Sequence, residues 1–418
     1  MPETLEPGAA TAPPAGTTAP PAAFALGRLP RIEFGAGTFR RVPEIAARHG
    51  SRALLVTGGR SLARSGRRDE LLAGLEASGV TLGGEAAALD EPSPALVDGI
   101  VAAHRGHDID VVIGIGGGSV LDTAKAVAGL LRTTASVVDH LEGLPGYRPY
   151  DGAVVPLVAV PTTAGTGSEA TRNAVISERG PDGYKRSFRD ERLVAADAVV
   201  DPDLLAGLGP TAIATNGMDA VTQLLEAYVS SRATAITDAL ALAGLEAARD
   251  GLLAWHADPD GPDAPAARAR TAYAALLSGI CLAHAGLGAV HGLASPLGAQ
   301  HPVPHGGACG ATLAAVTAAN VRALGERDPV SRALPRYARL GRLLARLPET
   351  TPDADARGAL VEALGAWTAT LGVPGLGAYG IGEAALPGIV ADARGSSMRT
   401  NPIVLTDDEL TAILRASL

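Results

Sequence analysis

VVIGIGGGSVLDTAKAVAGLLR (residues 111–132) holds the pattern that decides the fold. The run VVIGIGGGS (111–119) begins as an apolar strand and ends in three consecutive glycines. The run VLDTAKAVAGLLR (120–132) has the apolar spacing of a helix. A buried strand that runs through a glycine loop into a helix is typical of the nucleotide-binding units of α/β proteins.

The same alternation extends on both sides of this unit. RALLVTGG (52–59) predicts a strand, and LARSGRRDELLAGLEASG (62–79) predicts a helix. PLVAVPTTAGTGSEATR (156–172) predicts a strand followed by a polar loop, and RLVAADAVVDPDLL (192–205) closes the region. Short apolar runs that alternate with helices favour a Rossmann-like parallel sheet covered by helices.

The pattern changes near residue 203. Beyond it the chain is dominated by Ala/Leu-rich helical stretches, which we expect at 210–230, 233–254, 263–290, 308–323, 328–346, 354–371 and 406–417. We therefore expect an α/β dinucleotide-binding domain at 25–203 and an all-α domain at 204–418. Residues 1–24 form a Pro/Ala/Thr-rich tail with too little apolar surface to fold.

Composition limits the classes of function. A chain of 418 residues is long enough to build a large core. Its net charge of -9 argues against nucleic acid or an anionic membrane as a partner. Its two cysteines, Cys281 and Cys309, cannot form a disulfide framework, so we expect a reducing cytoplasm. The segment 271–303 lacks charged residues, but its histidines, glycines and Pro296 favour a buried helix over a membrane span.

The glycine loop is a candidate phosphate site. Gly116, Gly117 and Gly118 allow backbone amides to approach a phosphate, and Ser119 opens a helix whose positive end favours an anion. The spacing differs from the GxGxxG fingerprint because the third glycine comes too early. A tight turn without a ligand fits the same glycines.

Two charged residues follow on the same helix. Asp122 and Lys125 either form a surface ion pair or contact the ribose or nicotinamide of a cofactor.

The loop PTTAGTGSE (161–169) is a second candidate, because it is rich in hydroxyl groups and follows a strand. These hydroxyls belong to Thr162, Thr163, Thr166 and Ser168. A polar ligand at the carboxyl edge of the sheet would suit such a loop, although a structural Thr/Ser turn explains it equally simply.

The strand end VTGGRS (56–61) bears on the choice of cofactor. An acid here would bind the ribose 2′-hydroxyl and select NAD(H). This chain instead has Gly58, followed by Arg60 and Ser61, which favours NADP(H).

Four positions in the helical half suggest a metal site. Asp219 and Gln223 lie four residues apart on an expected helix, so their side chains share a face. His291 and His305 follow in Gly/Pro-rich apolar sequence, where an unpaired imidazole would be costly. A carboxylate with two imidazoles suits Zn²⁺ or Fe²⁺, whereas glutamine is a poor ligand. A surface carboxylate and hydrogen-bonded core histidines are the alternative.

The segments taken together resemble the iron-containing (group III) alcohol dehydrogenase family. The matching stretches are PRIEFGAGTF (30–39), GGGSVLDTAKA (116–126), PTTAGTGSEATR (161–172), VVDPDLL (199–205), GMDAVTQLLEAYVS (217–230), GLGAVHGLASPLG (286–298), PHG (304–306) and NPIVLTDDEL (401–410). They occur in family order and cover nearly everything after residue 25.

The resemblance implies a dehydroquinate-synthase-like architecture with the active site between the two domains, and homodimers or larger assemblies. It implies NAD(P)-dependent interconversion of a small alcohol and an aldehyde or ketone. The pyrophosphate loop maps onto Gly116, Gly117, Gly118 and Ser119. The nicotinamide side maps onto Asp122, Lys125, Thr162, Thr163, Thr166 and Ser168. The metal ligands map onto Asp219, Gln223, His291 and His305.

Two positions depart from the family. Histidine is usual at both Gln223 and Ser295, the latter near the nicotinamide and often assigned to proton transfer. The related glycerol dehydrogenases hold zinc with an Asp/His/His set, so the resemblance favours Zn²⁺ over Fe²⁺ as the bound metal. We expect Gln223 to be a weak ligand or a group beside the ligands. The metal-independent maleylacetate reductases alter the Asp219 position, which is intact here.

We expect reversible hydride transfer, with a metal on Asp219, His291 and His305 activating the substrate oxygen. The proton could come from water, the cofactor ribose, Ser295, His301 or His284. Three alternatives stay open. They are a metal-independent reductase of the same fold, a dehydroquinate-synthase-like lyase or cyclase, and a catalytically silent partner that binds nucleotide without turnover. The sequence does not name the substrate.

Overall fold

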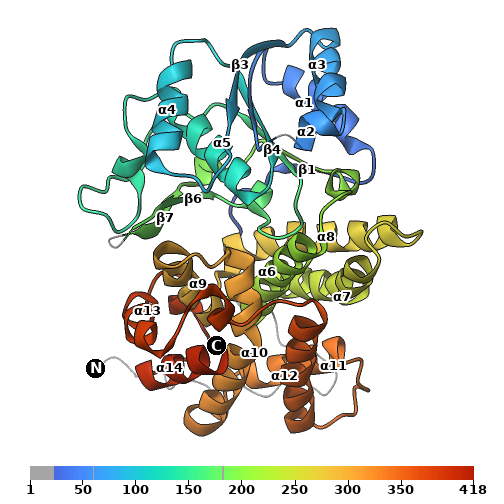
Figure 1. The fold of residues 1–418 in the computed structure, drawn as a ribbon, viewed down its shortest axis with the longest axis vertical. Helices are drawn as coiled ribbons and strands as arrows, with labels where there is room; N and C mark the ends of the chain where they lie inside the picture. The colour runs from blue at the N-terminus through green and yellow to red at the C-terminus, as the bar shows by residue number, and fades with distance from the viewer. Residues whose placement is uncertain (1–22, 60, 181–182) are drawn as a thin grey trace, which may run out of the picture.

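The sheet that the glycine loop belongs to forms one end of the molecule, and a group of helices forms the other (Figure 1). This computed structural model describes residues 23–59, 61–180 and 183–418. The part of the expected tail that precedes residue 23 lies outside the described residues.

Six parallel strands make the main sheet. They are β1 (Arg31–Phe34), β2 (Arg52–Thr57), β3 (Thr81–Ala87), β4 (Val111–Gly116), β5 (Leu157–Pro161) and β8 (Asp197–Val200), in the spatial order β1-β8-β5-β4-β2-β3. The strands β4 and β5 are buried along their whole length. Central strands with helices on both faces have no polar face, which explains their continuous apolar runs.

The strand order creates a switch point between β2 and β4. From β2 the chain moves outward to β3, then returns to β4 on the other side of β2 and continues to β5. The connections therefore leave β2 and β4 in opposite directions. In open α/β sheets, ligands bind at the carboxyl ends of the strands beside such a point.

Helices cover both faces of this sheet, and a hairpin projects from it. The helices are α1 (Val42–Ala47), α2 (Ser61–Arg64), α3 (Arg67–Ala77), α4 (Pro94–His104) and α5 (Gly118–Leu130). The antiparallel hairpin consists of β6 (Asn173–Glu178) and β7 (Tyr184–Arg189), and β6 packs against α5. The α5 helix is the central one, because it directly follows β4 and is buried over most of its length.

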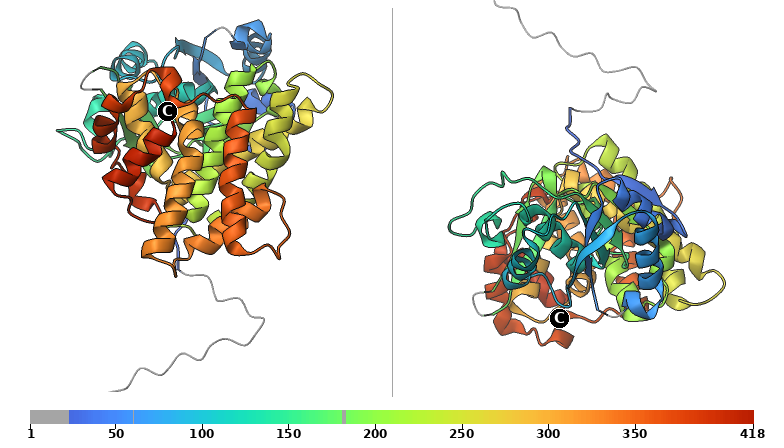
Figure 2. Two further views of the ribbon diagram at one scale, coloured as in Figure 1. Left: turned by 60° about the horizontal axis from the view of Figure 1, so that its bottom comes forward. Right: turned by 90° about the horizontal axis from the view of Figure 1, so that it is seen from above.

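The second half of the described chain is helical. Its helices are α6 (Pro210–Val229), α7 (Ala235–Ala257), α8 (Ala264–Ala285), α9 (Ala289–Gln300), α10 (His305–Arg327), α11 (Ala333–Leu344), α12 (Asp353–Thr370), α13 (Leu386–Asp392) and α14 (Asp407–Ala416). The α6 helix is central to this half, since it packs against α7, α8 and α10. Figure 2 shows α6, α10 and α12 side by side, seen from the side opposite the sheet.

Two of the expected helices are each divided in two. The helix expected at 62–79 ends at Arg64 and resumes at Arg67, because Gly66 adopts a left-handed conformation (φ 72°). The helix expected at 263–290 ends at Ala285 beside Gly286 (φ 72°), and α9 begins at Ala289. The axes of α8 and α9 differ by 102°. His291 consequently lies on a new helix with a new direction.

Several elements were not anticipated from the sequence. They are β1, α1, β3, α4, the β6–β7 hairpin and α13. The edge strand β3 (TLGGEAA) contains two glycines, a glutamate and a single large apolar residue, so its apolar signal is weak.

Among the described residues no single helix is long and apolar enough to cross a membrane. The pair α8 and α9 passes that test together by length and composition, with the sharp bend between them.

Candidate functional site

The glycine loop and the threonine loop pack against each other at the carboxyl edge of the sheet. A Cβ atom on Gly118 would lie 2.6 Å from Cγ2 of Thr166, and one on Gly117 would lie 3.2 Å from Cγ2 of Thr163. The backbone amide of Thr162 donates to the carbonyl of Gly116 at 2.9 Å. Because these loops follow neighbouring strands, the two predicted motifs form one surface.

The helix start presents free backbone amides beside the switch point. The α5 helix begins at Gly118, two residues earlier than expected, and no side chain caps it. Ser119 lies in its first turn. A helix N-terminus with uncapped N–H groups binds anions, so this end of α5 suits a pyrophosphate.

The end of β2 lies across the switch point from this helix. A Cβ atom on Gly58 would lie 3.3 Å from Cγ2 of Val120, so Gly58 packs against the first turns of α5. Arg60 lies outside the described residues. Ser61 begins α2.

Asp122 and Lys125 hold the threonine loop and the hairpin in place. The Lys125 ammonium lies 2.8–3.0 Å from four oxygen atoms, two on Ser168 and one each on Thr171 and Asn173. Asp122 accepts from the hydroxyl of Ser168 and from the amide of Val175. The alternative of a surface ion pair is wrong for Lys125, because its side chain is only 1% exposed. These two residues of α5 therefore hold the candidate cofactor loop in position through Ser168.

Burial shifts the pKa values of two charged groups in this region. Burial lowers the pKa of Lys125, opposed by the neighbouring carboxylates of Asp122 and Glu169. Burial also raises the pKa of Glu169 to about 7. Ser168 is fully engaged by Asp122 and Lys125, whereas Thr162 and Thr163 are half-buried at the start of the loop. Thr166 is half-buried too, so the threonines of this loop keep more solvent exposure than Ser168.

The predicted metal residues meet at the junction of three helices. Asp219 comes from α6, His291 from α9 and His305 from the first residue of α10. Oδ1 of Asp219 lies 3.3 Å from Nε2 of His291 and 3.7 Å from Nε2 of His305. His291 and His305, which follow Asp219 by 72 and 86 positions in the sequence, thus present their Nε2 atoms to one oxygen of its carboxylate.

Glu226 holds the His291 ring in place. It lies two turns after Asp219 on the same face of α6, and it is buried. Oε2 of Glu226 lies 2.7 Å from Nδ1 of His291, and Oε1 accepts from the amide of Val290 at 2.7 Å. This leaves Nε2 of His291 facing Asp219. A carboxylate on the far nitrogen is the usual partner of a metal-binding histidine, because it fixes the tautomer and the ring orientation.

The pKa values of the two histidines move in opposite directions. Carboxylates on both sides and the Cys309 sulfur raise the pKa of His291 well above 6.5, against the effect of burial. Burial lowers the pKa of His305 to about 4, so its imidazole is neutral and can act as a ligand at neutral pH. The pKa of Asp219 is lowered by both imidazoles and by a hydrogen bond from Gln223, despite burial.

Gln223 turns its oxygen away from this cluster. Its Oε1 accepts from the hydroxyl of Ser278 on α8 at 2.8 Å. Because this oxygen is bound to Ser278, the arrangement favours Gln223 as a group beside the ligands over Gln223 as a weak oxygen ligand.

Cys309 joins the cluster unexpectedly. Its Sγ lies 3.8 Å from Nε2 of His291, and ligand atoms of Asp219, His291, His305 and Cys309 all lie within 4.8 Å of one another. Burial raises the pKa of the Cys309 thiol to about 11. Four potential ligands around one point are the chemistry that a tetrahedral divalent metal requires.

The donor set fits a metal by its distances. Bonds of about 2.0–2.3 Å from a tetrahedral Zn²⁺ to nitrogen, oxygen and sulfur place the ligand atoms roughly 3.3–3.6 Å apart. Oδ1 of Asp219 lies 3.3 Å from Nε2 of His291 and 3.7 Å from Nε2 of His305, and Sγ of Cys309 lies 3.8 Å from Nε2 of His291. Small side-chain shifts would bring all four atoms to bonding distance.

Comparison with known proteins identifies the family of this chain. The model for the iron-containing alcohol dehydrogenase family matches residues 30–202, and that for the C-terminal part of the Fe-containing alcohol dehydrogenase family matches residues 213–418. Long-chain-alcohol dehydrogenase 1 of Geobacillus thermodenitrificans (strain NG80-2) is 32% identical over 379 residues, which cover 90% of this chain and 92% of that protein. The chain belongs to the iron-containing alcohol dehydrogenase family.

Other members of the family cover the chain as completely. The NAD-dependent methanol dehydrogenase of Bacillus methanolicus is 28% identical over 93% of this chain and 98% of that protein. An alcohol dehydrogenase structure from Oenococcus oeni superposes with a TM-score of 0.85 at 26% identity, covering 95% of this chain and 100% of that one. The present protein is therefore an NAD(P)-dependent, metal-assisted oxidoreductase that interconverts an alcohol and an aldehyde or ketone.

The candidate proton donors lie on or beside α9. Ser295 is half-buried and lies one turn after His291, while His301 is half-buried at the end of the helix. Nδ1 of His284 is 2.8 Å from the carbonyl of Ile280 on its own helix. In the described part of the chain, no hydrogen bond links any of these three to the Asp219 cluster.

Sequence reasoning missed Cys309 and Glu226. Both have a simple signal in hindsight. Cys309 lies four residues after His305, and Glu226 lies seven after Asp219, so each shares a helical face with a predicted ligand.

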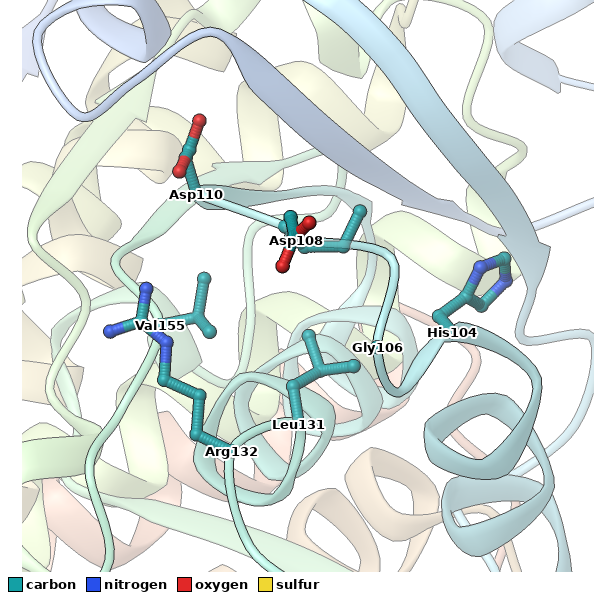
Figure 3. Close-up of a pocket in the computed structure, with 8 residues that line it drawn as sticks. His104, Gly106, Asp108, Asp110, Leu131, Arg132 and Val155 are labelled. Atoms are coloured by element: carbon teal, nitrogen blue, oxygen red, sulfur yellow. The ribbon is translucent and has the colours of Figure 1, made fainter.

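A separate pocket lies at the opposite edge of the sheet (Figure 3). It has a volume of about 230 Å³, and Asp108, Asp110 and Arg132 contribute to its lining. Asp108 and Asp110 precede β4, whereas the glycine loop follows it. At about 3.3 Å per residue, the strand separates the two by roughly 20 Å. This pocket is not part of the candidate active site.

Proposed function

We propose that the protein transfers hydride between NADP(H) and a small alcohol or carbonyl compound whose oxygen is activated by zinc held on Asp219, His291 and His305. The observation that carries this is the convergence of these ligands in the half of the molecule that packs directly against the threonine loop. Gly167 of that loop and Gly279 of α8 are in backbone contact. Ser278, the neighbour of Gly279, donates to Gln223, which lies one turn after Asp219 on α6.

The chain's residues divide the work between the two halves. Gly116, Gly117, Gly118 and Ser119 hold the pyrophosphate at the start of α5. The nicotinamide side of the cofactor contacts the threonine loop at Thr162, Thr163 and Thr166. The loop is kept in position by Asp122, Lys125 and Ser168. A bound metal supplies Lewis acidity at the substrate oxygen, and the nicotinamide supplies or accepts the hydride.

Around the metal, the protein controls orientation and protonation. Glu226 fixes the His291 ring, and Ser278 holds the Gln223 side chain beside Asp219. Burial keeps His305 neutral. Ser295 and His301 are the protein groups that we propose for proton exchange with the substrate oxygen, in place of the histidine that the family usually carries at position 295.

The choice of NADP(H) rests on Gly58, because a glycine cannot repel a 2′-phosphate as an acid would. The choice of zinc rests on position 223, where this chain has glutamine in place of the histidine that is usual in the family. We further propose a homodimer located in the cytoplasm, with a domain boundary near residue 203 and without nucleic acid or membrane partners.

A direct experiment tests the proposal. The purified protein would be analysed for bound metal and assayed with short aldehydes and NADH or NADPH, before and after chelation. We expect zinc near one equivalent, loss of activity on chelation, recovery on adding Zn²⁺, and a lower KM for NADPH than for NADH. Full activity in metal-free protein would refute the metal's role and favour the metal-independent reductase. A lower KM for NADH would refute the cofactor choice alone.

A further inference from the structure

The fourth position of the metal shell has a candidate occupant that the sequence pattern did not indicate. We propose that the Cys309 thiolate is a metal ligand and replaces the imidazole that the family usually supplies at position 223. The shell becomes Asp219, His291, His305 and Cys309, and the substrate oxygen would bind as a fifth ligand. This inference deepens the proposed function and rests on it, because it names the fourth ligand of the same site.

The first argument is position. His305 and Cys309 lie four residues apart on α10, so both side chains project from one face of that helix. The α10 helix packs against α6 and α9, which carry the other two ligands. The helix therefore delivers a nitrogen and a sulfur to the same point.

The second argument is distance. Sγ of Cys309 lies 3.8 Å from Nε2 of His291, close to the separation of about 3.6 Å that nitrogen and sulfur have on a tetrahedral Zn²⁺. All four ligand atoms lie within 4.8 Å of one another. Cys309 is completely buried, so its sulfur has no solvent contact that would compete with a metal.

The third argument is the orientation of Gln223. Its oxygen accepts from the Ser278 hydroxyl on α8, so the atom of Gln223 that could bind a metal is already engaged by another partner. A buried shell with only Asp219, His291 and His305 would be one protein ligand short of the family's set. Cys309 completes it from another helix.

The chain contains an internal comparison. Cys281 on α8 is equally buried, but its Sγ contacts the carbonyl of Thr237 at 3.5 Å and has no place in the metal cluster. Burial alone therefore does not distinguish the two cysteines. Their neighbours do.

A thiolate changes the chemistry of the site. Sulfur is a soft ligand that suits Zn²⁺, while hard oxygen ligands do not discriminate in its favour. Asp219 and Cys309 together neutralise the two charges of the metal, whereas a shell of one carboxylate and three imidazoles leaves one positive charge. Binding must also release the thiol proton, so metal uptake by this site is coupled to proton release.

The test uses the full-length protein loaded with Co²⁺ or Zn²⁺. We expect a thiolate-to-cobalt charge-transfer band in the near ultraviolet, and X-ray absorption of the zinc form should show one sulfur at about 2.3 Å among nitrogen and oxygen ligands. Neither measurement needs a variant or enzymatic turnover. Cobalt that binds with only nitrogen and oxygen signatures would overturn the thiolate ligand and leave the proposed function intact. Failure to bind any metal would overturn both.

Variants give a matched second reading. Cys309→Ser should remove the band and weaken metal affinity by at least about 100-fold, more than the loss of a group beside the ligands. Cys281→Ser should keep the band and the affinity. Adding Gln223→His to Cys309→Ser should restore affinity without the band, because an imidazole then fills the fourth position. Retention of the band in Cys309→Ser, or its loss in Cys281→Ser, would refute the assignment.

Discussion

Glu226 shows how one side chain sets the chemistry of another. Its two oxygens accept from the ring of His291 and from the backbone of Val290, so both are used. The carboxylate lies on α6 with Asp219, and the ring lies on α9. The pair therefore fixes the direction of Nε2 and the angle between the two helices.

Replacing Glu226 by glutamine tests that role. The amide keeps the size but turns an NH₂ group toward either His291 or the Val290 amide, where an acceptor is needed. We expect metal affinity to fall about 10–100-fold, because the ring loses its anionic partner. Competition with a chromogenic chelator would measure it. A variant with wild-type affinity would show that Glu226 has only a packing role.

Glu169, the last residue of the threonine loop, provides a pH test. Burial raises its pKa from 4.5 to about 7. Because the folded state holds the proton more tightly than the unfolded chain, the protonated carboxyl stabilises the fold fully below about pH 4.5. This contribution, at most about 3 kcal/mol, is lost as the pH rises through about 7.

We therefore expect the wild type to lose stability relative to Glu169→Gln between about pH 4.5 and 7. Urea unfolding at a series of pH values would show the difference. Parallel stability curves for the two proteins would contradict the prediction.

The ligands that the sequence predicted and those it missed differ in a simple way. Asp219, His291 and His305 belong to motifs whose residue types already suggest a metal. Cys309 is a single cysteine, and its meaning depends on how α10 packs against α9. The direction of α9 depends in turn on the break at Gly286, which no periodicity indicates.

At the scale of elements, close packing explains the glycines better than flexibility does. The loops after β4 and β5 approach so closely that Gly118 has no room for a side chain beside Thr166. The sequence predicted both loops, because each follows a continuous apolar strand. It could not predict their contact, which depends on β4 and β5 being neighbours in the sheet.

Gly118→Ala should therefore weaken cofactor binding. Its Cβ would lie 2.6 Å from Cγ2 of Thr166, which would push the threonine loop from the helix start. We expect the Kd for NADPH to rise about 10-fold or more, consistent with an overpacking cost of about 1–3 kcal/mol. NADPH fluorescence would measure it. Gly99→Ala, on an exposed face of α4 with open space around it, is the control.

A second variant makes that prediction sharper. Thr166→Ser removes the methyl group that clashes and keeps the hydroxyl that accepts from the Ser168 amide. The double variant should regain part of the affinity. If it binds no better than Gly118→Ala, the clash is not the cause.

At the scale of the molecule, the two halves meet backbone to backbone. Gly167 has φ 59°, and a Cβ on it would lie 2.4 Å from the amide nitrogen of Gly279. A Cβ on Gly279 would lie 2.1 Å from the carbonyl oxygen of Gly167. This contact sets the distance between the cofactor loop and the helices that carry the metal ligands. The sequence predicted both halves and left their docking open, because a glycine inside a helix has no periodic signature.

Gly279→Ala tests whether this contact positions the site. Alanine normally strengthens a helix, so any loss must come from the contact with Gly167. We expect unfolding stability to fall by about 1–3 kcal/mol and kcat/KM to fall more than metal affinity, because the ligands all lie on the helical side. Gly358→Ala, in open space on α12, should instead gain up to about 1 kcal/mol. A Gly279→Ala protein with wild-type kcat/KM would show that the distance between the halves does not control hydride transfer.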